Sequence, residues 1–392
     1  MINKNDLNEY FFKGIKPIQN LKIGVEHEKF ILNKNTFRPL SYDEDNGIKN
    51  ILERWSTEGW TPLYDDKQIT IVALSKNRES ITLEPGGQLE LSGAPLDNIH
   101  ETCEETTKHL HDLKKLGKEF NFILLGMGVE PNLTIDDFPW MPKQRYKIMK
   151  KYMQQVGKLG HHMMKRTCTN QVNIDYSSEQ DMVNKLRTML NLEAIATAIF
   201  SNSPFDEGRV SKYKSLRSHF WHHTDTKRTG LLPFVFDKGF NFERYTDYAL
   251  NVPMYFIKRD HKYIDMTNYT FKDYFEGKCN NLNHEITLQD WEDHLTTLFP
   301  QARLKQYLEI RSMDACSWNL ICSQPAFWVG ILYDDQIMDK VSEITQGWTE
   351  EDRQYLNKRV PEEGLQTKFK QKKLIELAQV FYELAKKGLI KR

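Results

Sequence analysis

Hydrophobic and polar positions alternate along residues 81–91, on both sides of a Pro-Gly-Gly break. The odd positions outside the break are aliphatic: Ile81, Leu83, Leu89 and Leu91. The even positions are polar or glycine, and they include Glu84, Gln88 and Glu90. Successive side chains of a strand point to opposite faces. The stretch therefore predicts two strand segments, with one face on a core and the other bearing two carboxylates and an amide.

The same two-residue period, or the 3.6-residue period of a helix, divides most of the remaining chain. It predicts strands at 21–32, 60–63, 69–74, 121–128, 168–176 and 304–312, and a hairpin at 252–258 and 262–266. It predicts helices at 4–13, 48–57, 97–119 (with Asp97 as N-cap), 142–157, 178–200 and 288–298. We interpret 205–233 as a long functional loop. No linker or repeat divides the chain, so we expect one domain over 1–392, mostly helical in 325–392.

Composition and charge narrow the class of protein. The chain has 392 residues, 39% of them hydrophobic, and equal numbers of acidic and basic residues, which argues against disorder and against a nucleic-acid partner. The N-terminus lacks the pattern of a signal peptide, and the longest apolar runs are too short to cross a bilayer. We therefore expect a cytoplasmic protein with no membrane partner.

Five cysteines are present, an odd number, and no two have C-x-x-C spacing. In a chain of this length they fit a reducing compartment better than a disulfide framework. Cys316 and Cys322 are close in sequence, so a local bridge between them stays open.

Two carboxylates recur in the strand around Glu26 and Glu28. Two residues of strand separate them by roughly 6–7 Å, a spacing at which they repel each other unless cations are near. Hard oxygen ligands of this kind suit Mg²⁺ beside phosphate. Alone, the pattern fits a solvated strand face equally well.

Two further strands show one polar face. Thr169, Gln171 and Asn173 share one parity and form a neutral strip suited to a zwitterion, although an exposed face would look similar. Glu309 and Arg311 could be a metal ligand beside a phosphate clamp, or an inert surface ion pair.

The combination favours a site. Solvent faces usually mix charges, whereas these faces carry five carboxylates with Arg311 as the only cation: Glu26, Glu28, Glu84, Glu90 and Glu309. So many carboxylates on one sheet face need cations, so we expect two or three Mg²⁺ ions holding a nucleotide triphosphate. No Walker A sequence is present, so metals and side chains would hold the phosphates. In the 205–233 loop, Arg217 and Arg228 suit carboxylates or phosphates, and the spacing of its three histidines does not favour zinc.

The motifs that carry these residues also resemble a known family. They are Gly24–Phe30, Leu83–Pro95 with its Glu-Pro-Gly-Gly-Gln core, Thr167–Asn173, the block from Arg217 to Phe236, Tyr248–Phe256 and Pro325–Gly330. In order, from about residue 20 to 335, they resemble the plant-type glutamate–cysteine ligases, which also occur in bacteria. The Glu-Pro-Gly-Gly-Gln block is specific to that family.

The resemblance implies a fold and a reaction. The fold class would be α+β, a strongly curved antiparallel sheet with helices outside, as in the catalytic domain of glutamine synthetase. The reaction would join L-glutamate to L-cysteine with ATP and Mg²⁺, through a γ-glutamyl phosphate, as the first step of glutathione synthesis. We expect a monomer or a homodimer.

It also implies roles for the residues singled out above. The metal ligands would be Glu26, Glu28, Glu84, Glu90 and Glu309, and Arg311 would stabilise the transferred phosphoryl group. Contacts to substrate or phosphate would come from Gln88, Thr169, Gln171, Asn173, Arg217, Thr224 and Arg228. The Pro-Gly-Gly break would give glutamate and phosphate clearance between Glu84 and Glu90.

One departure and three alternatives remain. Plant enzymes of the family are redox-regulated through cysteine pairs, but Met266 stands where we expect a cysteine, so Cys279 lacks its partner and we predict no such switch. The alternatives are a ligase for another amine, a cysteine ligase serving a pathway such as ergothioneine synthesis, and a binding protein. The binding protein would be a catalytically inactive ligase, or a nucleic-acid binder that uses the basic segment 368–373 with Lys386 and Lys387.

Overall fold

An open antiparallel sheet of nine strands forms the centre of the molecule, which is a computed structural model describing residues 2–65, 69–279, 282 and 284–392. The strand order is β14-β15-β7-β1-β5-β4-β3-β2, and β6 pairs with the far end of β1. The strands are β1 (Ile23–Asn33), β2 (Thr61–Tyr64), β3 (Ile71–Lys76), β4 (Glu79–Leu83), β5 (Leu89–Ser92), β6 (Phe122–Leu125), β7 (Asn170–Ile174), β14 (Ala302–Leu304) and β15 (Leu308–Ile310).

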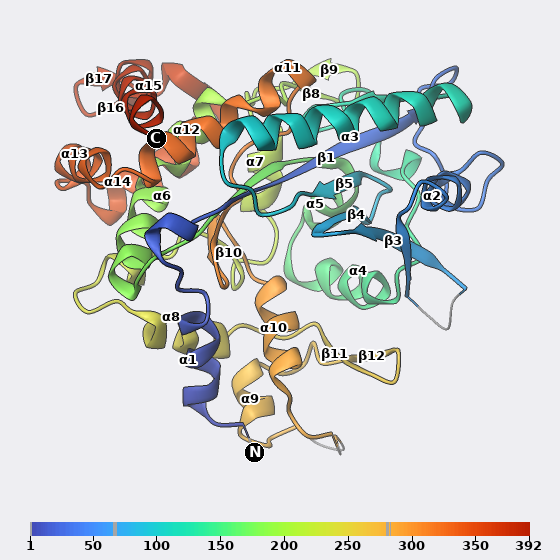
Figure 1. Ribbon diagram of the computed structural model, residues 1–392, viewed down its shortest axis with the longest axis horizontal. Helices are drawn as coiled ribbons and strands as arrows, with labels where there is room; N and C mark the ends of the chain where they lie inside the picture. The colour runs from blue at the N-terminus through green and yellow to red at the C-terminus, as the bar shows by residue number, and fades with distance from the viewer. Residues whose placement is uncertain (1, 66–68, 280–281, 283) are drawn as a thin grey trace.

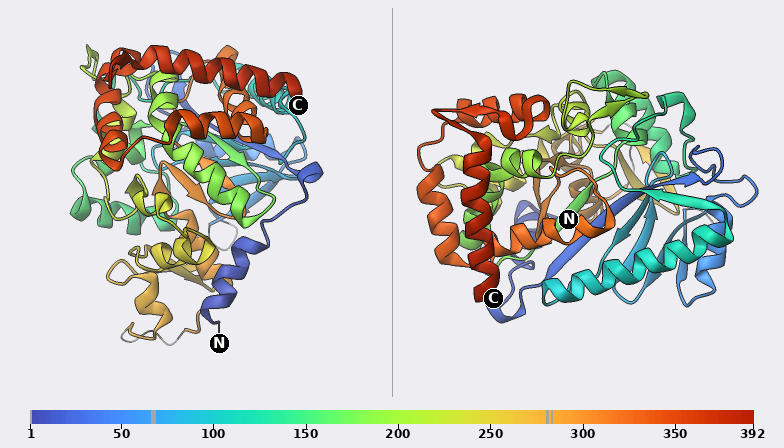
Figure 2. Two further views of the ribbon diagram at one scale, coloured as in Figure 1. Left: turned by 90° about the vertical axis from the view of Figure 1, so that its left-hand side faces the viewer. Right: turned by 90° about the horizontal axis from the view of Figure 1, so that it is seen from above.

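Helices surround this sheet on the outside (Figures 1 and 2). In chain order they are α1 (Lys4–Phe12), α2 (Ile48–Ser56), α3 (Ile99–Glu119), α4 (Gln144–Val156), α5 (Gly160–Arg166), α6 (Glu179–Ile199), α7 (Leu216–His222), α8 (Phe242–Leu250), α9 (Phe271–Phe275), α10 (Leu288–Thr296), α11 (Trp318–Ile321), α12 (Ser323–Leu332), α13 (Asp335–Thr345), α14 (Glu350–Glu363) and α15 (Leu374–Lys391). Figure 1 shows α3 lying along β1, and α12 to α15 gathered at the upper left, beside the start of α3. The expectation of one domain over residues 1–392 stays a proposal. No helix in the described part of the chain is long and apolar enough to span a membrane.

The strand register places the polar positions of four neighbouring strands on one face. Glu28 lies opposite Glu90, Glu26 opposite Gln171, and Asn173 opposite Glu309. Residues directly opposite one another in a ladder share a face. The alternate positions form the other face and are buried in two cores, beneath α3, α6 and α12: Val25, Leu89, Leu91, Val172, Leu308 and Ile310.

The Pro-Gly-Gly break between β4 and β5 is a tight turn packed against α5. A Cβ atom on Gly86 would lie 2.4 Å from the carbonyl oxygen of Lys165, and Gly87 has a φ of +88°. Glycine is therefore needed for backbone packing and for the turn conformation. The expectation that this break leaves clearance for substrate is therefore corrected, because the end of α5 fills the space beside Gly86.

Three elements differ from the pattern-based expectations. The 205–233 segment contains helix α7, which Ser215 caps through its side chain. The strand expected at 304–312 is two short strands, β14 and β15, joined by a turn at residues 305–307 that has no glycine or proline to signal it. The N-cap of α3 is Asn98, which accepts from the Glu101 amide, and not Asp97.

A disulfide joins Cys103 on α3 to Cys322, at the start of α12, across 219 residues. The expectation that all five cysteines are thiols is therefore wrong, as is the local bridge that Cys316 and Cys322 left open. The two cysteines that pair are far apart in sequence, so no spacing motif could reveal them. Cys279 is a free thiol, and Met266 is buried in the core, in agreement with the missing second pair.

Candidate active site

A cavity of about 210 Å³, called the main cleft here, opens on the polar face of the sheet. The sheet forms its floor, α4 and α5 contribute Met149 and Met163, and α7 contributes Arg217 and Trp221. Nine of the thirteen residues predicted as site residues line it: Glu26, Glu28, Glu84, Gln88, Glu90, Thr169, Gln171, Arg217 and the predicted catalytic Arg311. The fold therefore brings most of the residues predicted from the sequence pattern to one place.

Three of the cleft carboxylates are held by hydrogen bonds from the sheet. Glu28 accepts from the backbone N–H of Thr169 at 2.9 Å. Glu90 accepts from the Thr82 hydroxyl at 2.8 Å, and Glu26 from the Asn173 amide at 2.7 Å. The side chain of Glu84 makes no hydrogen bond or salt bridge to any described residue. Four carboxylates thus meet at one cavity with few neutralising contacts.

Electrostatics in the cleft disfavour this many negative charges. Burial, with Glu309 and Glu90 next in effect, raises the pKa of Glu26 to about 8. Burial and the neighbouring Glu84 also raise the pKa of Glu28 and the pKa of Glu90. Like charges that cannot separate favour protonation or bound cations. The cleft is therefore a site where a polyvalent cation would be stabilised.

Glu309 does not lie in the main cleft as expected. Both of its oxygens are bonded, by Arg303 at 2.6 and 2.8 Å, by Lys305 at 2.8 Å, and by Arg311. Burial alone would raise its pKa, but the three cations hold the pKa of Glu309 well below its usual range. In this structure Glu309 is the centre of a cation network that orients Arg311, and no free oxygen faces the cleft.

The amide and hydroxyl candidates are mostly engaged with the protein itself. Gln88 accepts from the Gly86 amide and donates to the carbonyls of Met164 and Thr167, so it fixes the turn. The Thr169 hydroxyl donates to Met313. Gln171 accepts from Arg311 and lies 3.4 Å from Glu90, so it links the cation network to the carboxylates. Gln171 is therefore the best placed of the lining amides to respond to a ligand.

Two of the candidates in the loop region lie outside the cleft. Arg228 is fully buried and donates to Asp225, Thr297 and Pro253, while its guanidinium stacks 3.9 Å from the Tyr255 ring centroid. The Thr224 hydroxyl donates to the Trp221 carbonyl. Both side chains stabilise the fold. Because both side chains are already bonded within the protein, the structure does not favour the substrate contacts predicted for them. The sequence alone could not show these partners.

Arginines that the sequence pattern did not single out also line the cleft. Arg145 projects from the first turn of α4, and its Nε is buried without a hydrogen-bond partner among the described residues. Arg217 has the same unpartnered Nε. Arg303 lines the cleft from β14, opposite Glu309. A prediction of a hairpin in this segment would have placed the two residues opposite each other. No local pattern marks Arg145, since helix 142–157 is rich in basic residues.

A second cavity of about 510 Å³, the side cavity, meets the main cleft at Glu26 and Thr296. Asn173 lines this cavity and not the main cleft. Its other lining residues include five cations: Lys13, Lys16, Lys22, Arg78 and Lys305. The two cavities therefore differ in character, with arginines over the carboxylates on one side of Glu26 and a lysine-rich hollow on the other.

The chain is similar to glutamate–cysteine ligases in sequence and fold. The pattern of "Glutamate-cysteine ligase family 2 (GCS2)" matches residues 22–389. Glutamate–cysteine ligase B, chloroplastic, of Oryza sativa subsp. japonica is 49% identical over all of this chain and 78% of its own length. The Arabidopsis thaliana glutamate–cysteine ligase, chloroplastic, is 47% identical, with 100% and 74% covered. These matches confirm the resemblance that the motifs indicate.

A solved structure supports the fold. The crystal structure of glutamate–cysteine ligase from Francisella tularensis in complex with AMP covers 95% of this chain and 79% of its own, with a TM-score of 0.54 and 13% identity. The expected α+β class, helices around an open antiparallel sheet, is thereby confirmed.

The expected cytoplasmic location is contradicted by the same relatives. The enzymes from rice, tomato and Arabidopsis are all named as chloroplastic. The sequence argument rested on a missing secretory pattern, and such a pattern says nothing about plastids. We therefore withdraw the cytoplasmic assignment.

Proposed function

The chain belongs to glutamate-cysteine ligase family 2, and on that premise we propose that its main cleft joins L-glutamate to L-cysteine with ATP and Mg²⁺. It is a glutamate–cysteine ligase, which forms γ-glutamylcysteine. The observation that carries the proposal for the site is the row of facing carboxylates, Glu28 with Glu90 and Glu26 with Gln171, under a set of arginines in one cavity.

The residues fit bound magnesium by donor type. Glu26, Glu28, Glu84 and Glu90 offer carboxylate oxygens, the ligands that Mg²⁺ prefers, and their mutual repulsion calls for cations. Among the described residues no three such groups are already drawn together as a finished metal set. Magnesium usually keeps waters and phosphate oxygens as ligands, so a finished protein set is not required. When bound, it would offset charge on the phosphates and the carboxylates.

The two cavities suit the two kinds of substrate. We place the nucleotide on the lysine-rich side, in the side cavity, with its phosphates toward Glu26. Glutamate would lie in the main cleft, with its α-carboxylate at Arg145 and Arg217, whose forks match carboxylates. This arrangement directs the γ-carboxylate of glutamate toward the shared boundary of the cavities.

The chemistry then needs orientation more than a reactive side chain. An oxygen of the γ-carboxylate attacks the γ-phosphorus of ATP, and ADP leaves. Arg311, held by Glu309 and Gln171, would stabilise the charge on the transferred phosphoryl group. The cysteine nitrogen then attacks the γ-acyl carbon, phosphate leaves, and the amine loses its proton. Trp221 and Phe299 lie within 6 Å of the Arg311 guanidinium and would keep water from it.

The reaction can be tested by ADP release. The purified chain is supplied with MgATP and glutamate, with and without cysteine, and then with other amino acids in place of cysteine. We expect cysteine to stimulate ADP release and γ-glutamylcysteine to be found by mass spectrometry. No stimulation by cysteine would overturn the assignment, and a better acceptor would redirect it to another amine.

The site can be tested through Glu84, whose side chain forms no hydrogen bond or salt bridge with any residue that the structure describes. Glu84→Gln should abolish turnover or raise the Mg²⁺ concentration needed for half-maximal rate, while circular dichroism shows an unchanged fold. Glu79→Gln, at the start of strand β4, which ends just before Glu84, lies outside the cleft; it is the matched control and should keep its rate. Unchanged Mg²⁺ dependence in Glu84→Gln would show that this face holds no metal.

A further inference from the structure

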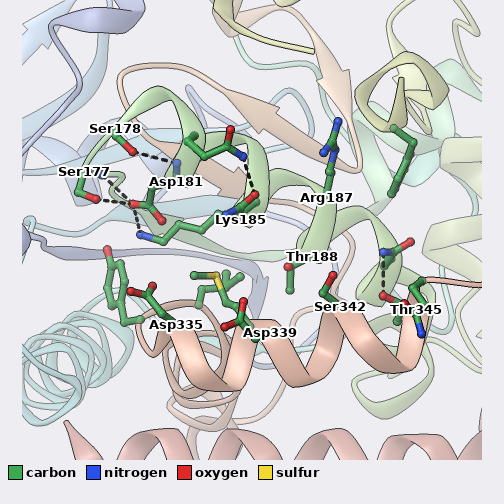
Figure 3. Close-up of a pocket in the computed structure, with 18 of the residues that line it drawn as sticks. Ser177, Ser178, Asp181, Lys185, Arg187, Thr188, Asp335, Asp339, Ser342 and Thr345 are labelled. Carbon is green, nitrogen blue, oxygen red and sulfur yellow. Dashed lines mark hydrogen bonds and ion pairs between the residues drawn. The ribbon is translucent and has the colours of Figure 1, made fainter. Parts of the chain in front are cut away.

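A third hollow, of about 890 Å³, lies between helices α6 and α13 (Figure 3). It shares no lining residue with the main cleft or the side cavity. Tyr333, Phe236 and Trp348 contribute aromatic wall, and the rest of the lining is mostly polar. We call it the α6–α13 groove. The proposed ligase mechanism makes no use of it.

One end of the groove carries two arginines that hydrogen bonds and stacking hold in place. Arg187 donates through Nε to the carbonyl of Val235 and through Nη2 to that of Asp237. Arg353 stacks 3.6 Å from the ring centroid of Phe236, the residue between these two carbonyls. Neither arginine forms a salt bridge, and Nη1 of Arg187 and Nη2 of Arg353 donate to no described residue. This end is a preformed site for an anion.

Carboxylates lie toward the other end, one turn apart on α13. Asp335 and Asp339 are exposed and have no salt bridge or hydrogen bond within the described chain. Lys185 is paired with Asp181 at 2.8 Å, and its charge also attracts Asp335, so Asp339 is the less compensated of the two α13 carboxylates. Figure 3 shows Asp335 and Asp339 along α13 on the side where α6 begins, and Arg187 further along α6. The groove is therefore electrically polar along its length.

Thr188 marks the middle of the groove. Its side chain is only 6% exposed, yet its hydroxyl has no hydrogen-bond partner among the described residues. Figure 3 shows this side chain pointing from α6 toward α13, into the groove. The hydroxyl oxygen itself is not sealed off and keeps contact with solvent in the groove. A polar group of a ligand would satisfy Thr188.

The spacing of the two ends limits the size of the ligand. The Asn191 amide donates to Thr345 and its oxygen accepts from Arg353, so Thr345 marks the arginine end. Asp339 and Thr345 are six residues apart on α13, about 9 Å at 1.5 Å per residue. A free amino acid carries its ammonium and carboxylate on one carbon and cannot reach both ends. An extended peptide gains about 3.3–3.6 Å per residue, so about three residues span the distance.

We propose that the α6–α13 groove binds a short zwitterionic peptide of about three residues. Its carboxylate lies between Arg187 and Arg353, its ammonium lies at Asp335 and Asp339, and its backbone bonds Thr188. The proposal concerns a site separate from the main cleft and does not depend on the proposed ligase mechanism.

Calorimetric titration of the full chain with triglycine tests the proposal. We expect one binding site for triglycine. Glycine should bind at least about tenfold more weakly because it is too short to reach both ends, and N-acetyl-triglycine amide should do so because it lacks both terminal charges. Absence of triglycine binding, or equal binding of the end-blocked peptide, would overturn the proposal. Saturating glutamate and MgATP should leave triglycine binding unchanged, and competition would instead place the peptide in the catalytic cavities.

Variants locate the site, and each of the two charge variants has a matched control. Asp339→Asn and Arg353→Gln should each weaken triglycine at least about fivefold, and Thr188→Val should weaken it while keeping the shape of the side chain. Glu343→Gln on α13 and Arg359→Gln on α14 remove the same charges from the same helices outside the groove and should bind normally. Equal affinities in variants and controls, with unchanged melting curves, would contradict the proposed site.

Discussion

At the scale of single residues, the function of a polar side chain depends on whether the protein already occupies it. Arg228 and Arg217 look alike in sequence, but Arg228 donates to Asp225, Thr297 and Pro253, whereas Arg217 donates through Nη2 to the Arg311 carbonyl and its Nε has no partner among the described residues. Glu309 likewise shares the alternation of Glu26 but is bonded by three cations. The pattern predicts which face a residue occupies. It cannot predict these partners, because Thr297 and Pro253 reach Arg228 from distant segments and the cations around Glu309 meet only where the chain turns back between β14 and β15.

Arg145 gives a direct test at this scale. Arg145→Gln should raise the KM for glutamate and lower kcat/KM about 10- to 100-fold, because a charge-assisted hydrogen bond to a carboxylate contributes about 1.5–3 kcal/mol. Initial rates at varied glutamate measure it. Lys147→Gln, exposed on the same helix, should keep wild-type values. A change in the KM for ATP alone would place Arg145 on the nucleotide.

Glu193 predicts a pH dependence of stability. This carboxyl is 3% exposed on α6 and accepts only from the Asn357 amide at 2.9 Å, and burial raises its pKa to about 7. A raised carboxyl pKa stabilises the folded protein at low pH, and that contribution is lost as the pH rises from about 4.5 through 7. The loss is about 3 kcal/mol at 1.36 kcal/mol per pKa unit.

Glu193→Gln should therefore unfold with a flatter pH dependence between pH 5 and 8 and should be more stable than wild type at pH 8. Urea denaturation at several pH values measures both. Glu350→Gln on α14, an exposed site, should follow the wild-type curve. Parallel curves for Glu193→Gln and wild type would show that this carboxyl is ionised in the folded protein.

At the scale of elements, alternation was enough to predict the four strands that carry the site. Their register confirms that the even positions near Glu90 and the matching positions of β1 and β7 share a face. Elements without a periodic or turn signal were missed: α7 within the 205–233 segment, and the turn between β14 and β15. Because no glycine or proline signals the turn at 305–307, the pattern did not show that the hairpin brings Arg303 and Lys305 to Glu309.

The β4–β5 turn allows a test of element packing. Gly86→Ala would place a Cβ 2.4 Å from the Lys165 carbonyl, so α5 must move away from the sheet. We expect a loss of about 1–3 kcal/mol in the free energy of unfolding, as in overpacked cores, and slower turnover because Glu84 and Glu90 flank the turn. Gly347→Ala, at a position with open space, should stay within about 0.5 kcal/mol of wild type. Denaturation and initial rates distinguish the two.

At the scale of the whole molecule, one covalent link connects segments that the sequence keeps 219 residues apart. Cys103 lies on α3, which covers β1, and Cys322 precedes α12, which packs on β7 and α15. The bridge therefore ties the helix over the centre of the sheet to the C-terminal helices (Figure 1). A cross-link of this kind restricts the unfolded chain more than the folded one.

We expect Cys103→Ser to lower the free energy of unfolding by about 2–4 kcal/mol without reductant. Wild type and variant should become equal in dithiothreitol, because reduction removes the same link from wild type. Cys279→Ser, which changes a free thiol, should match wild type under both conditions. Guanidinium denaturation with and without reductant measures the difference, and peptide mapping of the unreduced protein should recover Cys103 joined to Cys322. A stability difference that persists in dithiothreitol would mean that Cys103 acts through packing, since no disulfide remains there to be lost.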